Sequence, residues 1–170
     1  MFLTFDTETT GLPKNFNAPV SESENWPRLV QLAWQLNDNN GRLISVNSHI
    51  IKPDGYSIPY NSEKIHGIST EIALKEGKKL GDILKEFEKD LLRSKYIIGH
   101  NIKFDINIVG AEHYRKNFKS SIEDKLKIDT AIISKSFCNL QGGLGGGLKM
   151  PKLIEMYESV SYTHLRAHET

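Results

Sequence analysis

Residues 6–11, Asp-Thr-Glu-Thr-Thr-Gly, constrain this chain more than any other stretch. They end a short apolar run that predicts a strand over residues 1–6. Side chains alternate between the faces of a strand, so we expect Asp6 and Glu8 to share one face at the strand's end, with Gly11 in the following turn. Paired carboxylates supply hard oxygen ligands that suit Mg²⁺ or Mn²⁺. The alternative is a solvated strand end.

Composition describes one soluble domain. The 170 residues are 38% hydrophobic and 25% charged, which is enough for a real core. A net charge of +1 gives no global signal for nucleic acid, but it does not exclude an enzyme that holds a strand end through metal ions. The single Cys138 excludes an internal disulfide and fits a reducing compartment. Without a membrane-spanning stretch or a signal peptide, we expect a cytoplasmic protein with no membrane partner.

The order of predicted elements indicates an α/β fold. An antiparallel meander comes first, because a turn signal at residues 38–41 joins two strand patterns. Strand and helix patterns then alternate, which predicts a mixed sheet flanked by helices. The predicted strands are 1–6, 28–36, 43–51, 95–100 and 127–129, and the predicted helices are 70–75, 80–92, 102–114 and 130–137.

A second chemical motif lies at residues 99–105, Gly-His-Asn-Ile-Lys-Phe-Asp. It places Asp105 in the first turn of a helix that leaves a strand. Taken alone, a carboxylate there is explained by the helix dipole. Together with Asp6 and Glu8, it can converge at the edge of the sheet where α/β folds collect their sites.

These motifs resemble the DEDD superfamily of 3′→5′ exonucleases, and most closely the epsilon, or proofreading, subunit of bacterial DNA polymerase III. Residues 6–11 look like the first family motif and residues 100–105 like the second. Residues 65–69 are similar to the family's His-Gly-Ile turn, and residues 128–130 to its later Asp-Thr step. The resemblance covers residues 1–159 and implies a ribonuclease-H-like fold.

The resemblance implies a two-metal phosphodiester hydrolysis with Mg²⁺ or Mn²⁺, the two ions lying roughly 3.5–4 Å apart. Asp6 would bridge both ions, Glu8 would hold one and orient the attacking water, and Asp105 would hold the other. These three residues are the predicted catalytic and metal-binding set.

The same resemblance implies a substrate, the single-stranded 3′ end of DNA or RNA, and leaves a DNA polymerase partner open. His66 would line the pocket of the terminal nucleotide, although a turn-capping role is an equal alternative. His100 is expected to orient its neighbours, and His49 and His113 to lie at the surface or an interface. The predicted substrate-binding residues are Thr7, Thr9, Gly11, Leu12, His66 and Asn101.

The chain departs from the family at its third motif, a His followed five residues on by an Asp. His164 and Glu169 have that spacing with the wrong acid, and we assign them no catalytic role. Residues 160–170 can be back-translated into a string resembling the adapter of transposase-made sequencing libraries. We therefore expect an incomplete exonuclease domain over 1–159 and a non-native tail over 160–170, the alternative being a native exposed tail.

Two other functions stay open from the sequence alone. A non-catalytic nucleic-acid-binding module could keep the same fold, and an unrelated Mg²⁺ phosphatase could use the same carboxylates. A His-x₄-Asp motif in the authentic continuation would favour the exonuclease over the binding module.

Overall fold

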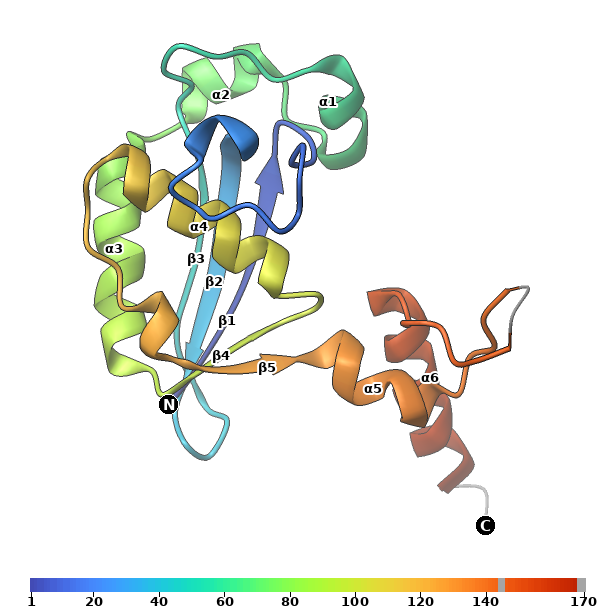
Figure 1. Ribbon diagram of the computed structural model, residues 1–170. Helices are drawn as coiled ribbons and strands as arrows, with labels where there is room; N and C mark the ends of the chain where they lie inside the picture. Colours follow the sequence, from blue (N-terminus) through green and yellow to red (C-terminus); the bar gives the residue numbers. More distant parts are fainter. Residues whose placement is uncertain (144–145, 168–170) are drawn as a thin grey trace.

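The computed structural model describes residues 1–143 and 146–167, with side chains as far as residue 161. Its first strand, β1 (Phe2–Thr9), shows the predicted alternation (Figure 1). Leu3, Phe5 and Thr7 are buried, whereas Asp6 on the other face is exposed and Glu8 is half-buried. The strand therefore turns an apolar face to the core and an acidic face away from it.

A mixed sheet of five strands, in the order β3-β2-β1-β4-β5, forms the centre of the molecule. β2 (Leu29–Asn37) and β3 (Leu43–Ile50) complete the antiparallel meander with β1. β4 (Tyr96–Gly99) and β5 (Leu126–Asp129) run parallel to β1. The predicted fold class, α/β with a ribonuclease-H-like mixed sheet flanked by helices, is confirmed.

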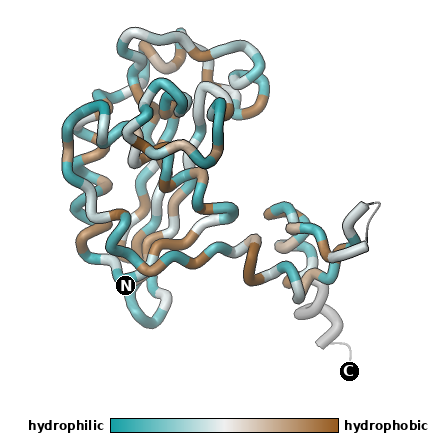
Figure 2. The backbone as a smooth tube through the Cα atoms, in the orientation of Figure 1, coloured by the Kyte–Doolittle hydropathy of each residue, from teal (hydrophilic) through white to brown (hydrophobic). Residues whose placement is uncertain are grey.

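Two helices cover the apolar face of the sheet, α3 (Leu80–Arg93) and α4 (Lys103–Arg115). In α3, Ile83, Leu84, Phe87 and Leu91 recur at helical spacing and are completely buried. Hydrophilic and hydrophobic residues alternate along its tube in Figure 2. The two tryptophans, Trp26 and Trp34, are also buried in this core.

Two short helices, α1 (Tyr60–His66) and α2 (Thr70–Glu76), cover the beginning of β2. A small apolar cluster holds them there, made of Val30, Ile58, Ile68 and Ala73. α2 was predicted, but α1 was not, because only Ser62 of its seven residues is buried and no apolar period marks it. Two 3-10 turns, Ser23–Asn25 and Ile122–Asp124, were also not predicted.

The last two helices, α5 (Thr130–Cys138) and α6 (Leu153–Ala167), pack on each other beside the sheet (Figure 1). α6 runs without interruption across the predicted boundary between residues 159 and 160. The side chain of His164 and all of Glu169 lie outside the described residues. None of the helices described here is long and apolar enough to cross a membrane.

Candidate active site

The acidic end of β1 is open on the side where β4 stops. β4 pairs only with Phe2, Leu3 and Thr4, so β1 continues past it. Beyond the end of β4, the first turn of α4 lies beside β1. Asp105 Oδ1 accepts hydrogen bonds from the Thr7 amide at 3.0 Å and from Thr7 Oγ1 at 2.6 Å. The second motif is thus joined directly to the first through Thr7.

The turn between β4 and α4 is fixed by its backbone. Asn101 has a φ of 62°, in the left-handed region that asparagine tolerates better than most residues. Its amide donates to Asp129 Oδ1 at 2.9 Å, and the same oxygen accepts from the Ala131 amide at 3.0 Å. Asp129 therefore caps α5 and also fixes the start of α4. The side chain of Asn101 is exposed. Its predicted contact with the substrate stays a prediction.

His100 orients its neighbours, in agreement with the expectation from sequence. Its Nε2 donates to the Pro151 carbonyl oxygen at 2.8 Å, and its Nδ1 shares a hydrogen bond with Thr130 Oγ1 at 3.0 Å. The ring thereby links the end of β4 to α5 and to the residues that precede α6. It also lies close enough to Asp6 to lower the pKa of that carboxyl, against the larger effect of burial.

The three predicted carboxyls have raised pKa values. Burial is the largest cause in each case. The Asp6 charge adds to the effect on Glu8, and together with burial it raises the pKa of Asp105 to about 7 against the hydrogen bonds from Thr7. The charges that oppose these shifts come from His100 and His66, and no lysine or arginine is among them in the described part of the chain.

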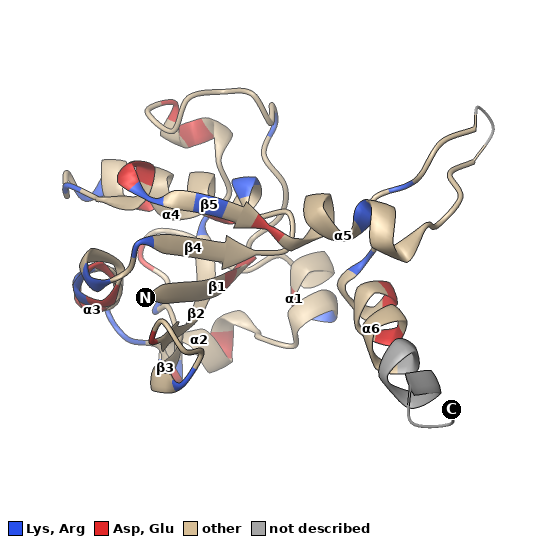
Figure 3. Cartoon of the chain, turned by 90° about the horizontal axis from the view of Figure 1, so that it is seen from below, with Lys and Arg blue, Asp and Glu red and all other residues tan. Residues whose placement is uncertain are grey.

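This donor set suits a hard divalent cation, because carboxylate oxygens that repel one another and lack a basic partner gain most from a shared ion. Among the described residues, however, no three His, Cys, Asp or Glu side chains form a ready-made metal site. Asp105 already uses Oδ1 for Thr7. The prediction that Asp6, Glu8 and Asp105 hold shared ions therefore stays a prediction. Figure 3 shows acidic residues towards the ends of β1 and β5.

The residues after β1 form an open turn. Thr9 Oγ1 donates to the Gly11 carbonyl at 2.7 Å, and Gly11 has a φ of 148°, which favours glycine. Leu12 follows with 74% of its surface exposed. The structure thus leaves backbone and an apolar side chain accessible beside Glu8, where a terminal nucleotide was predicted to bind.

His66 takes part in the turn that ends α1. Its Nδ1 accepts a hydrogen bond from the Ile68 amide at 3.1 Å, which is the capping role. Its Nε2 is buried and has no hydrogen-bond partner in the described structure. The ring also lies near enough to Glu8 to lower the pKa of that carboxyl. Capping therefore leaves one ring nitrogen without a hydrogen-bond partner among the described residues.

A cavity of about 430 Å³ opens on the acidic face of the sheet. Asp6 and His100 line it from the sheet side, and Leu153 and Met156 from α6. A volume of this order accommodates a small ligand. The cavity gives Asp6 a partly enclosed surrounding although the residue as a whole is exposed, which explains why its pKa is raised.

Sequence reasoning missed the ionic centre that anchors α4. Glu112 is completely buried and accepts hydrogen bonds from Arg28 Nε at 2.9 Å and from the Leu29 amide at 3.0 Å. The surface position expected for His113 is wrong, since the residue is 3% exposed and its Nδ1 bonds to the Val109 carbonyl. Nothing in the sequence indicates that Glu112 is buried, because its partners Arg28 and Leu29 are remote in sequence.

The raised pKa of Asp105 predicts a pH-dependent stability for the metal-free chain. A folded pKa of about 7 lies above the ordinary value of 3.8, so stability is lost as the pH rises between them. Asp105→Asn keeps an acceptor for Thr7 and removes the charge. In chelator, we expect its advantage over the parent chain in urea denaturation to grow by roughly 2–3 kcal/mol between pH 5 and pH 8.

The control for this experiment is Asp124→Asn, the same change at an exposed aspartate. Its stability should follow that of the parent chain at every pH. If the stability curves of Asp105→Asn and the parent chain ran parallel, the carboxyl of Asp105 would not be the group responsible.

The fold is of the ribonuclease-H-like type. The family model described as Exonuclease, of the RNase T type, matches residues 3–169, and the chain belongs to that family. The predicted membership in the DEDD-type exonucleases is thereby confirmed, whereas the particular likeness to the epsilon subunit stays a prediction.

Individual relatives agree with this assignment. The 3′-5′ exonuclease DinG of Bacillus subtilis (strain 168) is 28% identical over 167 residues, which are 98% of this chain but 16% of DinG. E. coli exonuclease I in complex with a dA16 oligonucleotide superposes with a TM-score of 0.71 at 18% identity, over 93% of this chain and 35% of that one. Its complex with a dT13 oligonucleotide gives 0.70 at 18% identity and the same coverage. These structures share the fold.

Proposed function

We propose that the chain is the catalytic domain of a metal-dependent 3′→5′ exonuclease that removes nucleotides from single-stranded 3′ ends. The observation that carries the proposal is the bond between Thr7 and Asp105, which joins the Asp6 and Glu8 strand to a third carboxylate. Support also comes from the family, from the likeness to the 3′-5′ exonuclease DinG and from the oligonucleotides bound to exonuclease I.

In this proposal, Asp6, Glu8 and Asp105 hold two ions, Mg²⁺ or Mn²⁺. When bound, such ions activate water and stabilise charge on the departing 3′ oxygen. Thr7 fixes the carboxylate of Asp105 through one oxygen and leaves the other available. His100 acts as a positioning residue, because both of its ring nitrogens are already bonded.

The terminal nucleotide would lie against the open turn after β1. The Gly11 backbone permits a close approach, and the exposed Leu12 offers an apolar surface to a base or sugar. Thr9 holds this turn through its bond to Gly11. Within the described part of the chain, His66 Nε2 is a buried polar atom without a hydrogen-bond partner, and a sugar hydroxyl or phosphate oxygen would satisfy it.

The third family motif is the part of the site that residues 1–159 do not supply. After Asp105, no histidine in that range is followed five residues on by an aspartate. We propose that the authentic continuation past Ser159 provides the general base and the fourth carboxylate. The family match to residue 169 and the unbroken α6 are compatible with a native tail as well, so sequencing the locus past Ser159 decides the point.

The test is an assay with Mn²⁺ on a single strand carrying fluorescein at its 5′ end, for the chain and for the chain with its genomic continuation. A ladder that shortens from the 3′ end, with mononucleotide products, is the expected result. Binding without shortening in both forms would establish the non-catalytic module instead. On a second labelled strand that ends in a 3′ phosphate, loss of that phosphate alone would establish a phosphatase, and internal cuts in either strand would contradict the 3′→5′ direction.

A further inference from the structure

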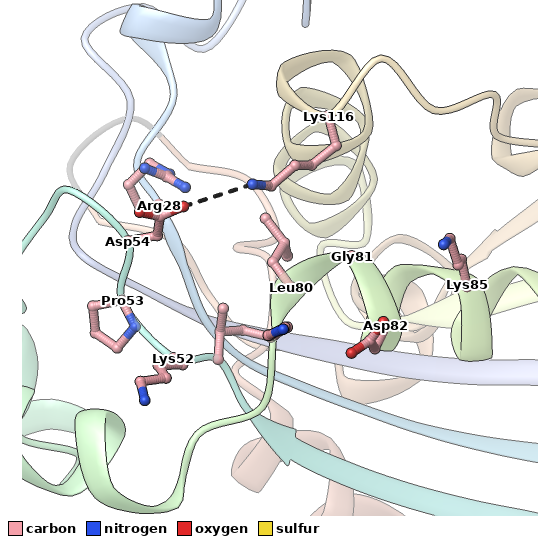
Figure 4. A pocket seen from close by; sticks show the side chains of 11 residues that line it. Arg28, Lys52, Pro53, Asp54, Leu80, Gly81, Asp82, Lys85 and Lys116 are labelled. Carbon is pink, nitrogen blue, oxygen red and sulfur yellow. Dashed lines mark ion pairs between the residues drawn. The ribbon is translucent and has the colours of Figure 1, made fainter.

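A second cavity, of about 420 Å³, lies apart from the acidic one, and none of its lining residues lines the cavity beside Asp6. It forms where the start of β2, the segment after β3, the start of α3 and the end of α4 meet (Figure 4). Ile51 and Leu80 contribute apolar surface to its wall. The size is within the range of small-molecule sites.

More cationic than anionic side chains line this cavity. Five cationic side chains line it against only two carboxylates, whereas the whole chain has 22 basic and 21 acidic residues. The local excess therefore contrasts with a nearly neutral chain. The cations are Arg28, Lys52, Lys79, Lys85 and Lys116, and the carboxylates are Asp54 and Asp82.

Most of these cationic groups are available to bind an anionic ligand. In the part of the chain that the structure describes, the ammonium groups of Lys52 and Lys79 form no hydrogen bond or ion pair, and that of Lys85 has only the Phe118 ring, 5.4 Å away. Lys116 pairs with Asp54 at 3.8 Å, with 86% of the Asp54 side chain exposed (Figure 4). Such a long, solvent-exposed ion pair contributes little to stability, and a competing anion displaces it readily.

Arg28 differs from the lysines because it is fixed. Glu112 accepts from its Nε at 2.9 Å and from its Nη2 at 3.5 Å, and its guanidinium lies 4.3 Å from the centre of the Tyr56 ring. One cation is thus preorganised at the cavity wall, and it keeps Nη1 as a further donor.

The backbone adds donors at the same place. α3 begins at Leu80, and its N-cap, Lys79, has no side-chain oxygen to accept from the first-turn amides. Gly81 lines the cavity without a side chain that could cover them. The positive end of a 14-residue helix therefore points at a basic cavity, partly offset by Asp82 in that first turn.

We infer that this cavity binds phosphate groups. Lysine ammonium groups, a fixed guanidinium and uncapped helix amides are the donors that phosphate oxygens prefer. The phosphate can come from the backbone of a nucleic-acid strand or from a free nucleotide. A strand is favoured by the position of Arg28, whose amide donates to Thr10 Oγ1 at 2.9 Å, just beyond the acidic segment of β1.

The first arm of the test measures strand binding by anisotropy with a fluorescein-labelled single-stranded oligonucleotide, in chelator, so that no hydrolysis occurs. Lys52→Gln/Lys79→Gln should bind about 5–20-fold more weakly at low salt. The slope of log affinity against log salt should become shallower by about one for each phosphate that the variant no longer neutralises. The matched control, Lys75→Gln/Lys89→Gln, removes the same charge from positions outside the cavity and should change affinity less than about twofold.

The second arm distinguishes the source of the phosphate. Amide resonances of Leu80 and Gly81 should shift when inorganic phosphate or AMP is titrated into the full chain. Reversal of the AMP shifts by the oligonucleotide supports a strand as the natural ligand. AMP binding that the oligonucleotide does not compete for supports a free nucleotide. An absence of shifts with phosphate, AMP and oligonucleotide, or equal weakening by both double variants, overturns the inference.

The strand arm rests on the proposed nuclease function, but the cavity does not. Failure of the cavity would leave 3′ shortening by the parent chain unchanged. Failure of the nuclease proposal would leave the phosphate shifts at Leu80 and Gly81 in place. The two outcomes are therefore distinguishable in the same protein.

Discussion

Asp6→Ala is expected to lower the rate of metal-dependent nucleotide removal by about 10³-fold or more in the active form of the enzyme. Lewis-acid stabilisation by bound ions supplies several kcal/mol to such reactions, and each 1.4 kcal/mol or so is tenfold in rate. Asp6 lies at the centre of the acidic site, since its charge raises the pKa of both Glu8 and Asp105. Mn²⁺-dependent shortening of a 5′-labelled strand measures the loss.

The fold should survive this substitution. Asp6 belongs to the face of β1 that points away from the core. Partial burial of its carboxyl raises its pKa, so the ionised form destabilises the metal-free protein. Thermal unfolding in chelator should show an equal or higher midpoint for the variant. Asp124→Ala, at an exposed site, should keep full activity. A folded Asp6→Ala enzyme that cleaves at the parent rate would remove Asp6 from the mechanism.

The sequence predicted the features of the site that depend on local pattern. Alternation along β1 places Asp6 and Glu8 on the face opposite Phe5, and the structure has them there. Helix and strand periods located every strand of the sheet and the two helices of the core within a few residues. Both signals are visible to inspection because they arise from burial that repeats at a fixed spacing.

The contacts that assemble the site could not be predicted in the same way. Thr7 and Asp105 are 98 residues apart, and nothing in either segment specifies that β4 stops early and admits α4. The position of Asp105 after a predicted strand made it a candidate, and the resemblance to a family gave it a role, but neither specified the hydrogen bond that fixes it. His66 shows a similar limit, since the sequence left capping and substrate contact open, and the structure assigns the two ring nitrogens different surroundings.

Charged residues in the core were missed for a related reason. A Glu and a His on a helix normally indicate a solvated face, although His113 has apolar spacing from Ile106 and Val109. Glu112 is buried only because Arg28, 84 residues earlier, reaches it. Residues 160–167 present the opposite case, since they lack the apolar period of a new element and yet continue α6 as part of the same helix.

Glu112→Ala is expected to destabilise the chain by about 3–5 kcal/mol, the largest stability effect of any single substitution we propose. Its carboxylate accepts from Arg28 and the Leu29 amide and pairs with Arg115 Nη1 at 3.0 Å. Removal would leave the Arg28 guanidinium and the buried Leu29 amide without their acceptor, and Arg115 without its counter-ion. Urea denaturation at neutral pH measures the change, with the slope of the transition checked for two-state behaviour.

The matched control is Glu123→Ala, which breaks an exposed ion pair with Lys127. That pair is shorter, at 2.6 Å, than the 2.9 Å between Glu112 and Arg28. Solvent screens it, so its loss should cost less than about 1 kcal/mol. Burial, and not distance, is then the variable that separates the two results. Equal effects would mean that water replaces Glu112 without penalty, and that α4, which carries Asp105 two turns earlier, is anchored by its apolar contacts alone.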